Sequence, residues 1–182
     1  NPPPALTFDL LREAQTDRTE LDSAPAAMVV TLVFPYISGQ PFVAMLHQAG
    51  GWYVVDAAYL DMPASTEQIL HEEKYLDRDT PVTLALPEPA AAMGDGWSEV
   101  HQNTLGELQI ALLLANLPAG SGFNGVTGHY TIPDPSWNAA AGWDGDRYAL
   151  WANASGQEAL VWRTAWDTEQ DARSFAAALV RY

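Results

Sequence analysis

The sequence predicts an α+β fold in which helices pack on a small, mainly antiparallel sheet, and three observations support this. Residues 148–153 and 158–166 are typical of strands, and Ala154-Ser-Gly-Gln157 between them is a hairpin signal. Apolar residues recur at helical spacing in residues 105–115 and again after residue 167. A chain of 182 residues, 48% of them hydrophobic and seven of them tryptophan, is large enough for one sizeable core.

The charge and the composition make some classes of binding partner and site unlikely. Twenty-three acidic residues against eight basic ones give a net charge of -15, which repels phosphate backbones and anionic lipid headgroups. We therefore expect no nucleic-acid partner and no membrane insertion, since no stretch approaches 18 uninterrupted apolar residues. Cations and basic peptides remain open as partners, although plain solubility also explains the charge. Without cysteine the chain builds neither a disulfide nor a thiolate zinc site.

The domain organisation is predicted as an arm followed by one domain. Residues 1–24 are expected to form an N-terminal arm or tether with a short helix, because Asn1-Pro-Pro-Pro favours extended chain and residues 6–21 show a weak helical pattern. Residues 25–182 are expected to form a single α+β domain. The start lacks an initiator methionine and the regions of an export signal, so we expect a mature or trimmed product.

The first half of that domain is predicted to be mainly helical. Residues 25–34 form a dense apolar run that periodicity alone leaves open between strand and helix, and Pro35 is expected to close it. Ser38 is expected to cap a helix that ends at Gly50-Gly51. A second helix is expected over residues 52–60.

The central stretch of residues 65–75 combines a capping signal, a histidine and several carboxylates. Ser65 and Gln68 have the spacing of a capping box. His71-Glu72 begins like the zinc-peptidase pattern H-E-x-x-H, but Tyr75 stands where the second histidine is required. We therefore interpret His71 and Tyr75 as one face of a short helix whose other side, with Glu72, is solvated.

The second half is predicted to contain the sheet. In residues 81–87, larger apolar side chains alternate with smaller ones, and a proline stands at each end, which predicts a strand. Residues 97–102 also alternate and are a candidate for the neighbouring strand. Thr104 and Glu107 suggest a second capping box. Residues 119–138 are expected to form a long loop, and residues 143–148 a turn stabilised by aspartates. Asp167 and Gln170 are expected to cap a last helix that packs on the hairpin.

No residue is predicted to be catalytic. The candidate groove or binding residues are His71, Glu72, Tyr75, His101, His129, Tyr130, Trp143, Asp144, Asp146 and Arg147. No metal ligand is assigned in the main hypothesis. An alternative zinc site would use His71, His101 and His129, with Glu72 beside them, because a catalytic zinc commonly has three protein ligands.

Several short motifs occur in the same order as in a poorly characterised family of exported bacterial proteins. These motifs are Phe34-Pro-Tyr36 with Gly39, Phe42-Val43, Gly50-Gly-Trp52, Ser65-Thr-Glu-Gln-Ile-Leu-His71, Glu73-Lys-Tyr75 and Gly142-Trp143 with Gly145-Asp-Arg-Tyr148. The chain resembles the C-terminal portion of these zincin-like, gluzincin-type metallopeptidase relatives from about residue 25 to residue 182. The resemblance implies a zincin-like remnant, because the family's H-E-x-x-H helix would precede Phe34 and is missing. No catalytic residue is carried over.

Three functions follow as hypotheses. The first is a non-catalytic extracytoplasmic module, secreted or lipid-anchored, that binds a peptide or protein partner and has no cofactor. The second is a metallopeptidase-like enzyme with a non-standard zinc site. The third is a structural or inhibitory partner of a full-length relative. The oligomeric state is left open.

Overall fold

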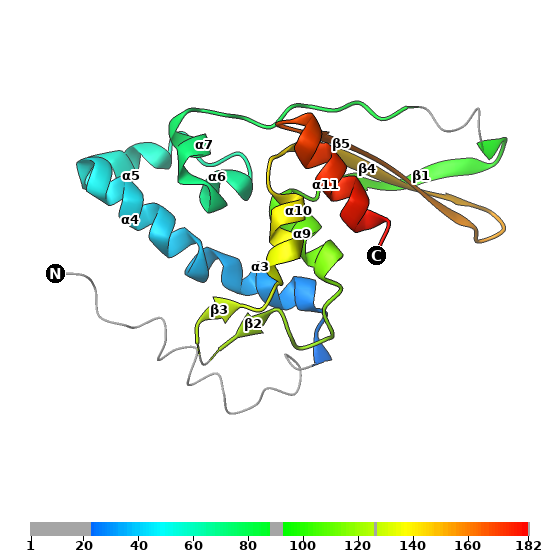
Figure 1. Cartoon of the computed structure of the whole chain (residues 1–182). Coiled ribbons are helices and arrows are strands. Elements are labelled where there is room, and N and C mark those ends of the chain that lie inside the picture. Colours follow the sequence, from blue (N-terminus) through cyan, green and yellow to red (C-terminus); the bar gives the residue numbers. More distant parts are fainter. Residues whose placement is uncertain (1–22, 88–92, 126, 182) are drawn as a thin grey trace. The chain divides into compact units, whose positions relative to one another are not determined.

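The computed structural model describes residues 23–87, 93–125 and 127–181, and it confirms the α+β fold class (Figure 1). The expected arm falls almost entirely outside these residues. The chain divides into two compact units, one made of residues up to 63 and 111–137, the other of 64–110 and 138–182. Two of the three boundaries fall inside the helices α9 (Glu107–Ala115) and α10 (Asp134–Ala140), and the third lies between residues 63 and 64. Whether both units behave as one domain stays a prediction.

The second unit is built on a three-stranded antiparallel sheet. Its strands are β1 (Trp97–Asn103), β4 (Trp143–Asn153) and β5 (Glu158–Trp166), in the order β1-β4-β5. The predicted C-terminal hairpin is confirmed as β4–β5, in which Trp151 pairs with Ala159 and Trp143 with Trp166. The turn predicted for residues 143–148 is wrong, because these residues begin β4 and carry a bulge between Trp143 and Gly145.

The last helix, α11 (Glu169–Leu179), packs on β5 as predicted. Its Phe175 stacks on Trp166 with ring centroids 4.7 Å apart and meets the edge of Trp162 at 5.4 Å. The predicted cap was wrong by one residue. The Thr168 hydroxyl, not Asp167, accepts the Asp171 amide at 3.2 Å, and Thr168 has the extended backbone that an N-cap requires.

Residues 80–87 are extended but are not a strand, so that prediction was wrong. They take part in no sheet ladder, and β1 pairs with β4 instead. The backbone amide of Val82 donates to the Asp144 carbonyl at 2.7 Å, and the Arg163 guanidinium donates to the Ala85 carbonyl at 3.0 Å. Residues 80–87, which we call the strap, are therefore an extended segment that is hydrogen-bonded to the sheet through Val82 and Ala85.

The central stretch forms two short helices in place of the single one expected. They are α6 (Glu67–Leu70) and α7 (Glu72–Leu76), and they break at His71, whose φ of -123° and ψ of 92° are extended. The capping box is half present, since the Gln68 amide donates to Ser65 Oγ at 3.3 Å but Gln68 Oε1 accepts from Ala64. His71 and Tyr75 therefore do not lie on one helical face.

The helix α9 begins at Glu107, and the predicted Thr104 capping box is not what holds its start. The carboxylate of Asp146 accepts the amides of Leu105 and Gly106 at 2.9 to 3.1 Å, while Thr104 Oγ1 donates to the Asp146 carbonyl. Asp146 is 40 residues away in sequence. The sheet, not the local sequence, supplies the cap.

The first unit contains the helices α3 (Ala26–Ile37), α4 (Gly39–Gly50) and α5 (Trp52–Ala58). The apolar run that periodicity left open is helical, and Pro35 lies inside α3 in place of ending it. Ser38 does not cap α4, because its hydroxyl bonds to the Tyr130 hydroxyl at 2.9 Å. The predicted stop is confirmed, as Gly51 has a left-handed φ of 68°.

Residues 119–138 are more ordered than the long loop expected. They hold a two-stranded sheet of β2 (Phe123–Asn124) and β3 (His129–Tyr130), followed by the start of α10. β2 packs on α3. Gly122 permits this approach, because a Cβ there would lie 2.6 Å from Val30 Cγ2 and its φ of 93° disfavours other residues.

The run Ala26–Gly50 is the one helical stretch in the described residues that is long and apolar enough to cross a membrane. Its mean hydropathy reaches 1.6 over an 18-residue window, of which 33% is buried against the rest of the protein. Length and composition alone do not separate a span from a core helix. The expected absence of membrane insertion stays a prediction.

Candidate binding groove

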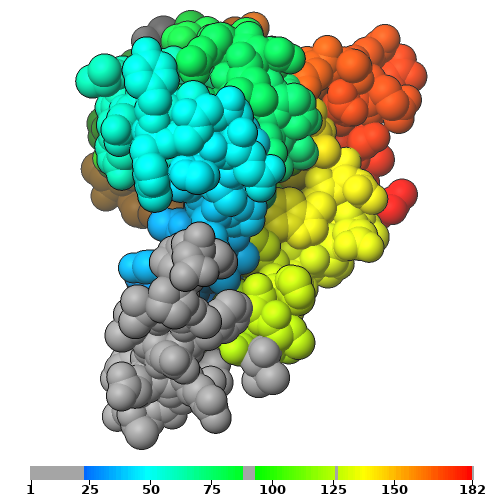
Figure 2. All heavy atoms as spheres, turned by 90° about the vertical axis from the view of Figure 1, so that its left-hand side faces the viewer, coloured from blue at the N-terminus to red at the C-terminus, as the bar shows by residue number. Residues whose placement is uncertain are grey.

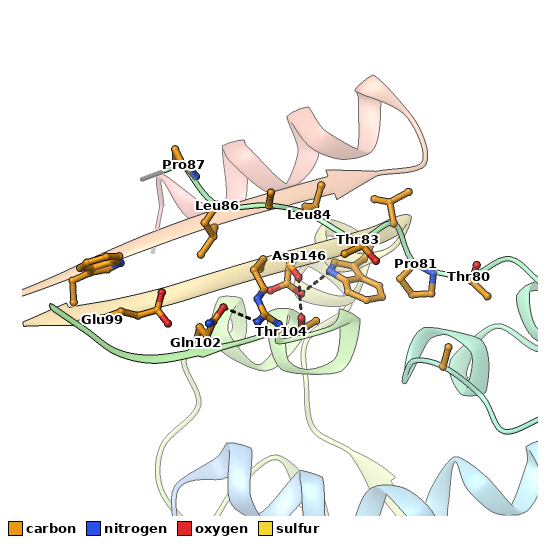
Figure 3. A pocket seen from close by; sticks show the side chains of 17 residues that line it. Thr80, Pro81, Thr83, Leu84, Leu86, Pro87, Glu99, Gln102, Thr104 and Asp146 are labelled. Carbon is orange, nitrogen blue, oxygen red and sulfur yellow. Dashed lines mark hydrogen bonds between the residues drawn. The ribbon is translucent and has the colours of Figure 1, made fainter. Parts of the chain in front are cut away.

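A groove of about 770 Å³ lies between the strap and the sheet of the second unit (Figure 3). Trp162 faces α11, so its neighbour Arg163 points to the other side of the sheet, where it holds the Ala85 carbonyl. The strap therefore crosses the sheet face that α11 leaves uncovered. A volume of 770 Å³ lies within the range of roughly 300–1,000 Å³ that is usual for ligand pockets.

The groove has polar and apolar walls. Thr83, Leu84 and Leu86 contribute from the strap, and Figure 3 shows them along one side. Across from them the sheet contributes Glu99, Gln102, Thr104, Trp143, Asp146, Arg147 and Trp151. The guanidinium of Arg147, the exposed carboxylate of Glu99 and the indoles of two tryptophans thus line the same space.

Arg147 is held in position inside the groove. Its Nη2 donates to Oε1 of Gln102 at 2.6 Å, which joins β4 to β1. A guanidinium has five N–H donors, and this hydrogen bond uses one of them. Arg147 can therefore receive a carboxylate, while Glu99 offers an acceptor for a cation.

Asp146 lines the groove but is committed to structure. Its carboxylate is 4% exposed and accepts Trp143 Nε1 and Trp162 Nε1, each at 3.0 Å, besides two backbone amides. Four donors saturate the lone pairs of a carboxylate. Asp146 is therefore the buried anchor of the groove floor and not a group free to take a ligand.

Asp144 holds the strap through its backbone. Its carbonyl accepts the Val82 amide, and its carboxyl group has a pKa raised by burial and by the nearby charges of Asp167 and Asp79. Of the predicted residues, Trp143, Asp146 and Arg147 line the groove, and Asp144 holds the strap beside it.

His71 lies in a buried polar cluster. Its Nε2 is 2.8 Å from Oε1 of Glu107, a residue only 2% exposed, and this hydrogen bond raises the pKa of His71 against the opposing effect of burial. Of the other predicted residues here, Tyr75 is buried with Arg78 stacked 4.8 Å from its ring centre, and Glu72 is half-buried.

Sequence reasoning missed the centre of this cluster, Lys74 and Glu67. Lys74, the single lysine of the chain, lies 2.9 Å from Glu67, 2.5 Å from Asp167 and 3.2 Å from Asp79. Burial would lower the pKa of Lys74, but these three carboxylates raise it. The rarity of lysine in so acidic a chain was the one available signal.

Glu67 has a strongly shifted pKa. Its side chain is 2% exposed, and desolvation raises its pKa from 4.5 to about 7 although Lys74 acts in the opposite direction. One ammonium shared by three carboxylates cannot hold all three ionised in a buried site, so the most buried of them retains its proton. Near neutral pH the cluster is therefore an ion network in which Glu67 retains a proton.

The remaining predicted residues lie elsewhere. His101 is exposed on β1, with its ring 5.8 Å from that of Tyr148. His129 and Tyr130 form β3 in the first unit, where His129 is exposed and burial raises the pKa of Tyr130. No three histidine, aspartate or glutamate side chains in the described ranges gather as a metal site would require, so the zinc set His71, His101 and His129 is not assembled there.

One comparison with known proteins gave a match. A family model described as Domain of unknown function (DUF8575) matches residues 90–182, just over half of the chain. Searches of curated proteins and of solved structures found nothing similar. The matched range contains the sheet side of the groove, with β1, β4 and β5, whereas the strap precedes it.

Proposed function

The chain belongs to the DUF8575 family, and we propose that it is a non-catalytic module that binds an extended peptide segment of a protein partner in the groove. The observation that carries this proposal is the groove itself, about 770 Å³ between the strap and the sheet. An extracytoplasmic location and a zincin-like origin, suggested by the sequence resemblance, are part of the proposal.

The shape of the groove suits an extended chain. The strap is itself an extended segment that runs along the sheet with few backbone bonds to it (Figure 3). Beside it, β1 is an edge strand with no further neighbour in the described part of the chain, and its residues are almost all exposed. Exposed strand edges bind peptides by adding a strand, and pockets for alternate side chains then give specificity.

The chemistry of the walls suits a peptide with an acidic group and an apolar residue. Arg147 can pair with a side-chain or terminal carboxylate, in the geometry that guanidinium groups favour. Trp151 offers an aromatic face, and such anchors supply much of the affinity of peptide interfaces. Asp146 keeps the floor rigid, because all four of its hydrogen bonds are internal.

A selection of random 12-residue peptides on the immobilised protein tests the proposal. Selected peptides, titrated by calorimetry, are expected to bind wild type and to lose at least tenfold in affinity with Trp151→Ala or Arg147→Ala. Trp52→Ala is the matched control, because Trp52 is an exposed tryptophan of the other unit. A selection that enriches nothing, or binding that Trp151→Ala leaves unchanged, would refute the groove as a peptide site.

The enzyme and inhibitor hypotheses are tested separately. Stoichiometric zinc in the purified protein, with a melting temperature that a chelator lowers, would favour the metallopeptidase alternative. Direct, saturable binding to a full-length relative that no groove variant weakens would favour a structural or inhibitory partner.

A further inference from the structure

The helix α3 is apolar on every side. Val30 and Val33 are buried on one side, while Met28 and Leu32 are more than 60% exposed on the other. It contains no charged residue. A helix that is hydrophobic all round is normally covered on all sides, by protein or by lipid. Among the described residues, nothing covers the exposed side of α3.

This uncovered surface extends beyond α3. Figure 2 shows α4, in light blue, and α5, in cyan, facing the viewer. We call the following exposed residues of the first unit the apolar face: Met28, Leu32, Tyr36, Val43, Trp52, Tyr53, Tyr59, Leu60 and Met62. Monomeric proteins rarely expose so many large apolar side chains along consecutive elements without a binding role.

Within the described residues of the first unit, the formal charges have one sign. Residues 24–73 contain no lysine and no arginine. In the described part of the first unit the only residues that carry a formal charge at pH 7 are Asp56, Asp61 and Asp134. Asp56 and Asp61 are exposed and flank Tyr59 and Leu60 in sequence. The face thus has an acidic rim.

These charges argue against a lipid cover. Helices that lie on membranes carry lysine and arginine on their polar side, and residues 24–73 contain neither. Carboxylates at the rim are instead repelled by anionic headgroups. The composition agrees, because six of the nine residues are tryptophan, tyrosine or methionine, which are enriched in protein interfaces.

The same charges argue against a second copy of the chain. In a two-fold dimer both chains contribute the same patch, so one acidic rim would lie against another acidic rim. Each chain also carries a net charge of -15. Like charges across an interface suppress association.

We propose that the apolar face docks onto a different protein, whose apolar surface is rimmed by lysine and arginine. Apolar contact through Trp52, Tyr53 and Leu60 would supply the affinity, and pairing with Asp56 would set orientation and association rate. This surface belongs to the first unit and is independent of the peptide groove of the second.

The probe for this chemistry is a 14-residue amphipathic helical peptide of leucine and lysine, compared with its leucine and glutamate analogue. The test variant combines Trp52→Ser, Tyr53→Ser and Leu60→Ser, which are 67%, 83% and 92% exposed and so leave the core intact. The control is Leu160→Ser, an exposed apolar residue of the second unit that does not line the groove. Circular dichroism checks that each variant is folded.

The lysine peptide is expected to bind wild type and the control at least tenfold more tightly than the triple variant, and the glutamate peptide not to bind. Asp56→Asn is expected to weaken binding about threefold, as for an exposed ion pair. If the lysine peptide bound the triple variant as tightly as wild type, attraction to the net negative charge would explain the binding, and the proposal would be overturned. Two other results would overturn the proposal. Binding of wild type, but not of the triple variant, to neutral phosphatidylcholine vesicles would favour lipid as the occupant. Self-association of wild type on a sizing column, lost in the triple variant, would favour a second copy of the chain.

Discussion

The indole Nε1 of Trp143 donates a hydrogen bond of 3.0 Å to Oδ1 of Asp146, three residues along the same strand. The bulge between Trp143 and Gly145 makes this possible, because without it the two side chains would point to opposite faces of β4. The same carboxylate also binds Trp162 on β5 and the backbone before α9. One buried side chain therefore joins the sheet, the groove floor and a helix start.

Replacement of Asp146 by asparagine is expected to destabilise the protein by about 3 kcal/mol, because an amide has one acceptor oxygen and leaves buried donors unpaired. Urea unfolding followed by tryptophan fluorescence measures the change. Asp134→Asn, at an exposed carboxylate, is the matched control and should stay within about 0.5 kcal/mol of wild type. Equal stability of the two variants would show that the Asp146 hydrogen bonds contribute little.

Lys74→Met is expected to lower the free energy of unfolding by about 2–3 kcal/mol, since it removes the cation shared by Glu67, Asp79 and Asp167. Chemical denaturation at pH 7 measures it. Arg173→Met removes an exposed ion pair with Glu169 and should cost less than about 0.5 kcal/mol. Lys74→Arg should restore part of the loss. A Lys74→Met protein as stable as wild type would contradict the network.

The raised pKa of Glu67 predicts a specific pH dependence. Between its unfolded pKa of 4.5 and its folded pKa of about 7, the folded state holds a proton that the unfolded state has released, so stability falls as pH rises. At 1.36 kcal/mol per pKa unit this group contributes a loss of about 3 kcal/mol over that window. His71 adds to the loss above pH 6.5, because its pKa is also raised.

Urea unfolding at pH 5, 6, 7 and 8 tests this dependence. The Glu67→Gln variant keeps the shape of the side chain without its titration, so the difference between it and wild type isolates Glu67. The variant is expected to lose less stability than wild type between pH 5 and pH 7. Parallel pH profiles of the two proteins would show that Glu67 titrates normally.

Gly145→Ala is expected to loosen the strap. A Cβ at Gly145 would lie 2.5 Å from the Val82 carbonyl oxygen, a backbone atom that cannot turn aside, so the strap must move away from β4. Hydrogen exchange at the Val82 amide should accelerate at least tenfold, as its bond to Asp144 is broken. Gly156→Ala is the control, because Gly156 also has a positive φ, of 75°, but nothing lies within 4 Å of its Cβ position. Unchanged exchange at Val82 would show that the strap tolerates the extra methyl group.

Local sequence patterns determined those elements in which the turn residues, the helix stop or the apolar period favour the same structure as the tertiary contacts. The hairpin at 154–157, the glycine stop at Gly51 and the helical spacing around Phe175 each depend on residues close in sequence, and the structure confirms them. The alternation in residues 97–102 likewise predicted a strand. For these segments the backbone preference and the apolar period favour the same conformation.

Only the tertiary structure decided which pairings those elements make. The strap has the alternation of a strand, but β4 already has β1 and β5 as neighbours, so the strap crosses the sheet and creates the groove. The Lys74 network joins residues as far apart as 74 and 167, and Asp146 caps a helix that begins 39 residues before it. Such contacts depend on which charged and polar groups lose water together on folding, and no local spacing in the sequence encodes that.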